Sequence, residues 1–173
     1  MDLKETICTI PNYPIPGVMF RDITSLIQNG EALKESCDLL AEYARKVGAE
    51  VVVGPESRGF IFGCPIARDL SIGFVPIRKP GKLPRETISE EYSLEYGTNT
   101  LEVHKDAIKP GQKVLIVDDL LATGGTTEAV IRLVERLQGE VVGCAFVIEL
   151  PDLKGRELLK GYDVYSLVEF EGD

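Results

Sequence analysis

The chain has few of the residues on which many catalytic and metal sites depend. It contains one histidine, His104, so sites with several histidine ligands and dyads that pair serine or cysteine with histidine are poorly supported. We expect His104 to lie on the surface of a strand. The four cysteines are far apart and form no C-x-x-C motif, which predicts buried or half-buried free thiols in a reducing compartment.

Long apolar runs are also missing. Stretches such as residues 114–117 hold four or five apolar residues, whereas a membrane span needs about 18. The first five residues carry two acids and no apolar segment, so we expect no secretory signal. These features predict a cytoplasmic protein with no membrane partner.

The chain has a net charge of −9, which argues against binding to nucleic acid because phosphates would be repelled. The charge is uneven, however. Residues 78–85 include four basic residues and no acid, namely Arg78, Lys79, Lys82 and Arg85. Such a strip is either a solvated basic loop or part of a site for a small anionic ligand.

Apolar strands that alternate with amphipathic helices indicate an α/β fold, with a mainly parallel sheet covered by helices on both faces. The length of 173 residues suits a single domain. Residues 79–99 are polar and without a sustained period, which predicts a long lid loop. Strands are predicted at 50–53, 74–77, 113–117, 140–148 and 163–168, and helices at 31–47, 57–70, 126–137 and about 153–159. Pro76 places its strand at an edge or bulge.

Residues 114–127 read V-L-I-V-D-D-L-L-A-T-G-G-T-T, a strand followed by an acidic pair, a glycine loop and a helix start. The small residues 122–125 let backbone N–H groups turn inward, and the positive end of the helix points to the same place, which suits a phosphate monoester. No Walker A lysine follows the glycines. Two carboxylates beside a phosphate would repel it unless a sugar lay between them. Asp118 and Asp119 can accept hydrogen bonds from the vicinal hydroxyls of such a sugar.

This element resembles the motif with which type I phosphoribosyltransferases bind 5-phosphoribosyl 1-diphosphate (PRPP). The resemblance implies that Asp118 and Asp119 bind the ribose hydroxyls. It further implies that the 5-phosphate is surrounded by Ala122, Thr123, Gly124, Gly125 and Thr126.

Residues 54–60, G-P-E-S-R-G-F, follow another strand and open a helix. Alone they could be an ordinary Gly-Pro turn; beside the first motif they resemble the diphosphate loop of the same family. The resemblance implies a non-proline cis peptide near Glu56-Ser57. It also implies a diphosphate site made of Glu56, Ser57, Arg58, Arg78, Lys79 and Lys82.

Five motifs in order, P-G-V-x-F-R-D-I, E-S-R-G-F, R-K-x-G-K-L-P, Y-S-L-E-Y-G and V-D-D-L-L-A-T-G-G-T, are similar to those of the family members that use adenine. The resemblance implies transfer of phosphoribose from PRPP to adenine, giving AMP and diphosphate. Residues 1–30 would form a hood over the purine. Phe20 and Leu150 would enclose the ring, and backbone groups of Met19 and Arg21 would read its edge.

The resemblance also supplies a catalytic pair and a cofactor. Glu95, on the lid, would exchange a proton at N7 of adenine, and Arg58 would stabilise the leaving diphosphate. Mg²⁺ would be held through substrate oxygens and water, with Asp118 and Asp119 as the candidate protein ligands. Family members are commonly homodimers, so a homodimer is expected.

Two alternatives stay open from the sequence. One is a phosphoribosyltransferase for another base, such as hypoxanthine, xanthine or orotate. The other is a non-catalytic PRPP sensor. No role is assigned to Arg85 or Glu86, which we expect to be solvated.

Overall fold

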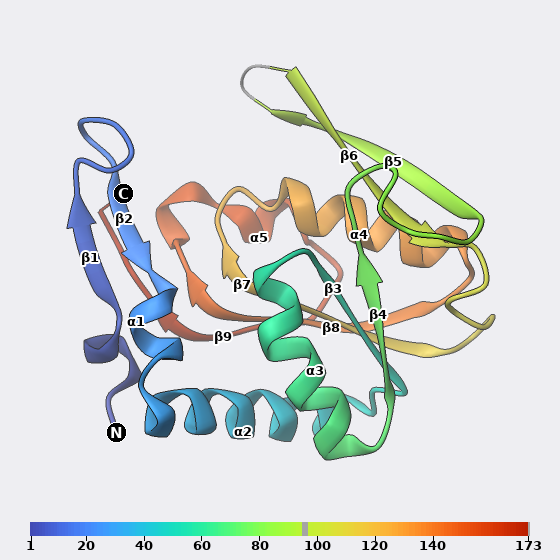
Figure 1. Ribbon diagram of the computed structural model, residues 1–173, viewed down its shortest axis with the longest axis horizontal. Helices are drawn as coiled ribbons and strands as arrows, with labels where there is room; N and C mark the ends of the chain where they lie inside the picture. Colours follow the sequence, from blue (N-terminus) through green and yellow to red (C-terminus); the bar gives the residue numbers. More distant parts are fainter. Residues whose placement is uncertain (95–96, 173) are drawn as a thin grey trace.

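The centre of the computed structural model, which describes residues 1–94 and 97–172, is a five-stranded sheet (Figure 1). Every strand pair in this sheet is parallel, which confirms the predicted fold class. In spatial order the strands are β4 (Gly73–Ile77), β3 (Val51–Pro55), β7 (Lys113–Leu121), β8 (Glu140–Glu149) and β9 (Val164–Glu169). β4 is an edge strand, as Pro76 predicted.

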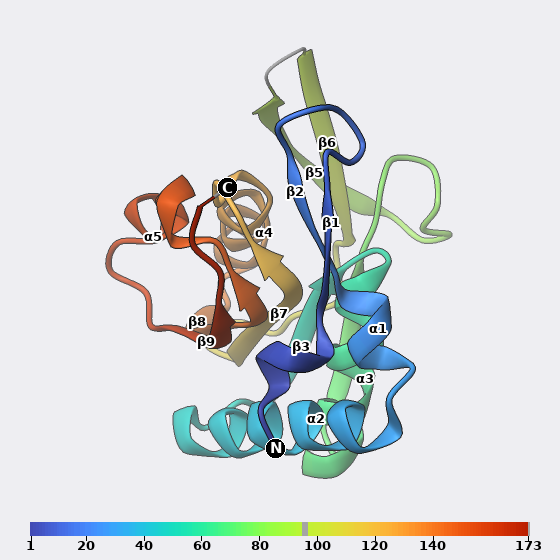
Figure 2. The ribbon, with the colours of Figure 1, turned by 90° about the vertical axis from the view of Figure 1, so that its left-hand side faces the viewer.

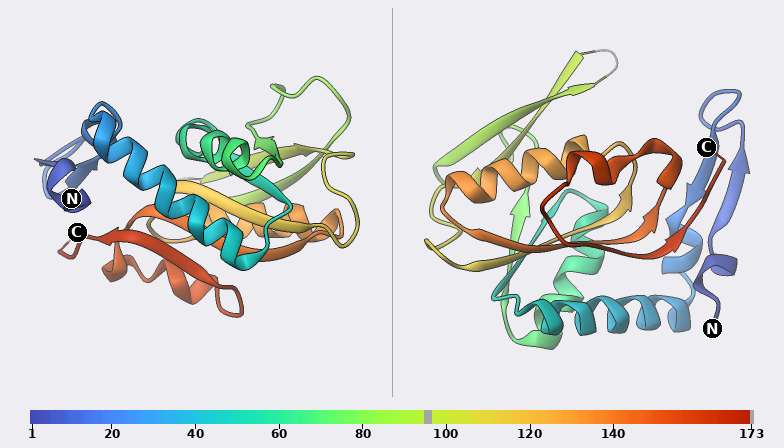
Figure 3. Two further views of the ribbon diagram at one scale, coloured as in Figure 1. Left: turned by 90° about the horizontal axis from the view of Figure 1, so that it is seen from below. Right: turned by 180° about the vertical axis from the view of Figure 1, so that it is seen from behind.

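Helices cover both faces of this sheet (Figure 3). Successive strand residues point to opposite faces, so Val52 and Leu115 pack under one pair of helices while Val53 and Ile116 pack under the other. The pairs are α2 (Gly30–Val47) with α3 (Arg58–Leu70), and α4 (Gly125–Arg136) with α5 (Gly155–Leu158). The predicted long helices are confirmed, and the predicted helix at about 153–159 is reduced to the 3₁₀ turn η2 (Pro151–Leu153) and the single turn α5.

The amino-terminal segment forms a small hairpin beside the sheet, which we call the hood hairpin (residues 8–22). It pairs β1 with β2 in antiparallel register and rises past the carboxyl ends of the sheet strands (Figure 2). Its loop is largely exposed, including Tyr13, Ile15 and Val18. Its elements and flanking helices are η1 (Leu3–Thr6), β1 (Cys8–Pro11), β2 (Met19–Asp22) and α1 (Ile23–Ile27).

The prediction of a long irregular loop at residues 79–99 is wrong for its second half. β5 (Thr87–Leu94) and β6 (Gly97–His104) form an antiparallel hairpin, called here the lid hairpin (residues 87–104), which rises from the same end of the molecule as the hood hairpin (Figure 1). The strand pattern was hidden because an acid, Glu90, is half-buried on the inward side. Arg132 and Arg136 of α4 hold it, with N–O distances of 2.9 and 2.7 Å.

Three smaller expectations also change. β7 continues through the acidic pair to Leu121, because its partner β8 pairs with it up to Glu149. His104 lies in a strand as expected but is buried, and its Nε2 accepts a hydrogen bond from the Arg85 N–H at 3.3 Å. All four cysteines are free, but Cys8 and Cys64 are exposed.

In the part of the chain that the structure describes, no helix has the length and apolar character of a membrane span.

Candidate active site

Two adjoining cavities lie beyond the carboxyl ends of β3 and β7, where ligands bind in parallel sheets. The first, of about 400 Å³, joins the hood hairpin to the segment around the acidic pair. The second, of about 350 Å³, lies between residues 55–58 and the lid hairpin. Arg58, Asp118, Asp119 and Thr126 line both, so the two cavities form one continuous site.

The glycine loop, residues 122–126, forms the floor of the first cavity. Gly124 has φ +91°, a backbone conformation that side chains rarely adopt, and it caps the start of α4. This turn brings the amino end of α4 to the cavity, where unpaired backbone N–H groups favour an anion. The loop, Ala122, Thr123, Gly124, Gly125 and Thr126, therefore lies where the sequence predicted it.

The acidic pair faces the same cavity from the end of β7. Asp118 accepts a hydrogen bond from the Asp119 N–H at 2.8 Å, and Asp119 accepts one from Arg58 Nε at 2.5 Å. Burial, followed by the neighbouring Asp119 carboxylate, raises the pKa of Asp118 well above its ordinary value. The Asp119 side chain, only 8% exposed, pairs with that of Arg58, which is 58% exposed.

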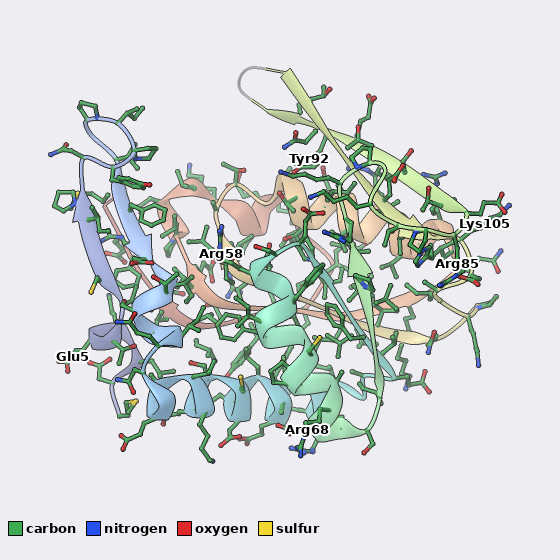
Figure 4. The ribbon with its side chains drawn as sticks, viewed as in Figure 1. Glu5, Arg58, Arg68, Arg85, Tyr92 and Lys105 are labelled. Atoms are coloured by element: carbon green, nitrogen blue, oxygen red, sulfur yellow. The ribbon has the colours of Figure 1, made fainter. Side chains whose placement is uncertain are left out.

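Arg58 stands at the start of α3, and Tyr92 lies on the lid hairpin, both at the end of the molecule where the cavities open (Figure 4). The peptide bond Glu56-Ser57 that leads into α3 is cis, which confirms the expectation from the family resemblance. Ser57 and Arg58 both line the second cavity. The helix start and one arginine thus reach the place expected for diphosphate.

Glu56 gathers the cations of residues 78–82. Its carboxylate accepts from Arg78 Nε at 3.2 Å, from the Lys79 N–H at 2.9 Å and from Lys82 Nζ at 2.6 Å. These contacts, led by the hydrogen bond from Lys82, lower the pKa of Glu56 to about 2. Glu56 also lines the second cavity, so its place at the diphosphate site stays a prediction; its carboxylate binds the side chains of Arg78 and Lys82.

The hood end of the site is built differently. Met19, Phe20 and Arg21 of β2 line the first cavity together with Leu150, which follows β8. Phe20 is 37% exposed and packs edge-on against Tyr13, with ring centroids 5.1 Å apart. The structure thus brings together the four residues expected to enclose the base and leaves Phe20 accessible from the cavity.

Two expectations concern the lid. Glu95 lies outside the described residues. Arg85 pairs with Asp106 at 3.2 Å, and Lys105 with Glu86 at 3.5 Å, at largely exposed positions. Arg85 and Lys105 lie at the end of the molecule remote from Arg58 (Figure 4), in agreement with the solvated loop that we expected.

Several lining residues carried no clear signal in the sequence. Tyr92 and Leu101 line the second cavity from the lid hairpin. A period-two pattern centred on Ile88, Glu90 and Tyr92 would have placed Tyr92 on the inward face of a strand. Predicting that face requires pairing Glu90 with arginines more than 40 residues away, which the local pattern does not contain.

The donor set suits a metal ion carried mainly by its substrate. Among residues 1–94 and 97–172, no group of three or more His, Cys, Asp or Glu side chains is arranged to hold a metal ion. Asp118 and Asp119 supply carboxylate oxygens, of which one already binds Arg58. Mg²⁺ commonly binds through one or two carboxylates plus substrate phosphates and water, so the residues present fit that mode.

Comparisons with known proteins agree with this geometry. The phosphoribosyl transferase domain family matches residues 23–172. An adenine phosphoribosyltransferase from Lactobacillus gasseri is 59% identical over 172 residues, which cover 99% of this chain and 98% of that protein. The crystal structure of adenine phosphoribosyltransferase from Thermoanaerobacter pseudethanolicus is 50% identical, with a TM-score of 0.93 and coverage of 98% of each chain. The enzyme from Saccharomyces cerevisiae, complexed with an imino-altritol bisphosphate and adenine, is 40% identical, with a TM-score of 0.90 over 96% of this chain and 97% of that one.

Proposed function

The chain belongs to the phosphoribosyl transferase family, and from that premise we propose how its residues divide the work of one reaction. The activity is that of an adenine phosphoribosyltransferase in purine salvage, which converts adenine and PRPP to AMP and diphosphate. The curated relative and the solved structures favour this activity over transfer to another base and over a non-catalytic PRPP sensor.

One observation carries the division of roles. A single cavity is lined both by Met19–Asp22 of the hood hairpin and by the glycine loop. A nucleoside 5-phosphate has a base at one end and a phosphate at the other, and its sugar hydroxyls lie between. The acidic pair lines this cavity and also the second one, which suits contact with the sugar that joins those groups.

The PRPP end is assigned to β7 and the loop after it. Asp118 and Asp119 accept hydrogen bonds from the ribose hydroxyls, and the N–H groups of residues 122–126 bind the 5-phosphate at the start of α4. Because Arg58 is already bound to Asp119, its cation lies next to the anomeric carbon of a bound sugar phosphate.

The diphosphate end is assigned to Ser57, Arg58 and the cations of residues 78–82. Glu56 holds Arg78, Lys79 and Lys82 together before substrate binds, which lowers the cost of ordering them. In the transfer these cations stabilise negative charge on the departing diphosphate.

The base end is assigned to the hood. Phe20 and Leu150 enclose the purine ring, and backbone groups of Met19 and Arg21 pair with its N1/N6 edge. Hypoxanthine reverses the donor and acceptor at those positions, so a fixed backbone pair would be left unpaired with it.

The chemical step is a displacement at the anomeric carbon. N9 of adenine forms a bond to that carbon while the bond to the diphosphate oxygen breaks, and diphosphate leaves with the bonding electrons. Glu95, which lies outside the described residues, takes the purine proton through N7. Asp118 and Asp119 are the candidate protein ligands of Mg²⁺, which would supply positive charge to the diphosphate when bound with the substrate.

The remaining assignments concern the whole chain. We treat residues 1–173 as one catalytic domain, with residues 1–30 as the hood and residues 79–99 as the lid. A cytoplasmic location is supported by four unpaired cysteines, and fractionation of cells that produce the chain tests it.

A homodimer is supported by the exposed Ile61 and Cys64 on α3, next to the open edge of β4. Light scattering should give twice the mass of one chain.

Diphosphate release with PRPP, Mg²⁺ and each purine in turn tests the activity directly. We expect turnover with adenine and little with hypoxanthine. Equal turnover of both would contradict the reading of the purine edge by the hood. No turnover with any base would favour a non-catalytic protein that only binds PRPP.

A further inference from the structure

An ion pair between buried Glu149 and half-exposed Arg156 takes no part in the reaction as described so far. Glu149, the last residue of β8, is 4% exposed. Its two carboxylate oxygens accept from Arg156 Nε at 2.8 Å and from an Arg156 terminal nitrogen at 2.9 Å, and Ser166 Oγ donates to it at 2.8 Å. Such a two-pronged pair fixes the plane of the guanidinium as well as its position.

Arg156 follows Gly155, and Gly155 touches the glycine loop backbone to backbone. A Cβ on Gly155 would lie 2.5 Å from the carbonyl oxygen of Ala122, and a Cβ on Gly124 would lie 2.8 Å from the carbonyl oxygen of Gly155. Both distances are shorter than real Cβ contacts allow. The start of α5 and the loop therefore interlock in a way that two glycines alone permit.

The connection that carries Gly155 is tied to β7 at its other end as well. Leu121 and Glu149 are register partners, and the Leu150 N–H donates to the Leu121 carbonyl oxygen at 3.0 Å. The Glu149 side chain then reaches forward to Arg156. The Glu149–Arg156 pair thus closes residues 149–156 into a short loop, called here the bracket. This loop packs against the chain where it leaves β7 and enters the glycine loop.

We propose that Arg156, anchored on Glu149, is a positioning residue that presses Gly155 against residues 122–124 and holds the glycine loop in its phosphate-binding form. Arg156 does not line either cavity, so it acts through the loop and not on the ligand. This inference rests on the proposed assignment of the 5-phosphate to residues 122–126.

The physical reason lies in how backbone groups bind an anion. N–H groups bind a phosphate well when they converge before it arrives, because ordering a loose loop subtracts from the binding free energy. Loosening the bracket should therefore weaken the binding of ligands that carry the phosphate. Ligands that use only the ribose and base positions should be unaffected.

Titration calorimetry with AMP and with adenosine, which lacks the phosphate, tests this on the full chain. Arg156→Gln should lower the affinity for AMP about tenfold, because small displacements of binding groups are costly. The affinity for adenosine should stay unchanged. Arg156→Lys keeps the charge and one hydrogen bond to Glu149, so it should restore part of the AMP affinity and is expected to fold. In steady state the KM for PRPP should rise while the KM for adenine and kcat stay constant.

Arg68→Gln is the matched control. Arg68 is a largely exposed arginine near the opposite end of α3 from Arg58 (Figure 4), and it contacts Asp69 at 3.5 Å. Its loss should change neither affinity. Equal weakening of AMP and adenosine in Arg156→Gln, or an unchanged AMP affinity, would overturn the proposal.

Thr126→Ala separates this proposal from the assignment on which it rests. If Thr126→Ala weakens AMP binding and Arg156→Gln does not, the phosphate assignment is supported and the role of the bracket is contradicted. If neither variant affects AMP binding, the bracket proposal fails, and an unchanged AMP affinity in Gly124→Ala, which displaces the loop backbone, would show that the phosphate is bound elsewhere.

Discussion

Gly17 in the hood hairpin and Gly124 in the glycine loop have nearly the same backbone φ, +92° and +91°, but very different surroundings. A Cβ on Gly17 would meet nothing within 4 Å, whereas one on Gly124 would meet the Gly155 carbonyl oxygen at 2.8 Å. Each turn needs glycine for its conformation. At Gly124 the close approach of another backbone is a second requirement.

This difference extends to the two ends of the site. At the phosphate end the chain is fixed by backbone packing, and Gly124, Thr127 and Gly155 are buried. At the base end the hood hairpin exposes Tyr13 and Phe20 and is held by a few side-chain contacts. A phosphate needs several N–H groups fixed in advance, while a planar base can be held by one aromatic face and an edge.

The largest effect is expected where the two ends meet. Asp118→Asn combined with Asp119→Asn removes both carboxylate acceptors for the ribose hydroxyls, and each charged hydrogen bond contributes about 1.5–3 kcal/mol. PRPP affinity should therefore fall by about 100-fold or more. Isothermal titration with PRPP measures this. An unaltered affinity would remove the acidic pair from the sugar site.

Gly124→Ala and Gly17→Ala test the comparison directly. Both place alanine at a strained φ, which costs about 1–2 kcal/mol of folding free energy. Gly124→Ala must also displace a backbone carbonyl, so AMP affinity should fall about 30-fold, while Gly17→Ala should leave it unchanged. Denaturant unfolding and AMP titration on both variants separate the two effects.

Equal losses of AMP affinity in these two variants would mean that the phosphate end is no more rigid than the hood. That outcome would also undermine the role given to Gly155.

The local structure of the glycine loop could be predicted from the sequence because its pattern is local. A strand, two acids, small residues and a helix start follow one another within 14 residues, and the helix start supplies the N–H groups. The same is true of the long helices. For α2 the spacing of Leu33, Cys37 and Leu40, with Gly48 after the last turn, predicted both the face and the end that the structure has.

The lid hairpin could not be predicted in this way, because its inward face depends on remote partners. Glu90 points inward only since Arg132 and Arg136 meet it from α4. The position of Glu56 has a similar cause, since its carboxylate is satisfied by Lys82, 26 residues further along the chain. A single sequence shows that such charges exist but not which of them meet.

Phe20→Ala probes the base end. Removing a ring that stacks on a base costs about 1–3 kcal/mol, so the KM for adenine should rise about tenfold while the KM for PRPP stays constant. Phe20→Tyr keeps the ring and should behave almost as the unmodified chain. If the KM for PRPP rose in parallel, the hood would be supporting the whole site and the two ends would not be separable.

Asp118 should make sugar binding depend on pH. Its raised pKa, caused by burial and then by Asp119, means that the protonated form persists above the pH at which an ordinary aspartate ionises. A protonated carboxyl accepts a sugar hydroxyl less well, so adenosine affinity should increase about fivefold from pH 5 to pH 8. Asp118→Asn should flatten this profile. Adenosine is the suitable probe because it has no phosphate that titrates in this range.

The smallest effect is expected from Phe170, which braces the hood from the carboxyl-terminal segment. Its ring, 8% exposed, lies 4.6 Å from the Arg21 guanidinium, and Arg21 also donates to the Glu171 carbonyl oxygen at 3.2 Å. Phe170→Leu keeps an apolar side chain but removes the cation–π contact, which contributes about 0.5–1 kcal/mol. Since Arg21 belongs to the segment proposed to read adenine, the KM for adenine should rise about threefold with the KM for PRPP unchanged.

Lys4→Gln provides the control for Phe170, because Lys4 Nζ lies over the same ring at 4.9 Å but belongs to η1, outside both cavities. Its loss should leave both KM values as they are. A rise in the KM for adenine with Lys4→Gln as large as with Phe170→Leu would mean that general support of the ring matters, and not its contact with Arg21. A rise confined to Phe170→Leu would show that the hood depends on single side-chain contacts, in contrast to the glycine loop, which is held by its backbone.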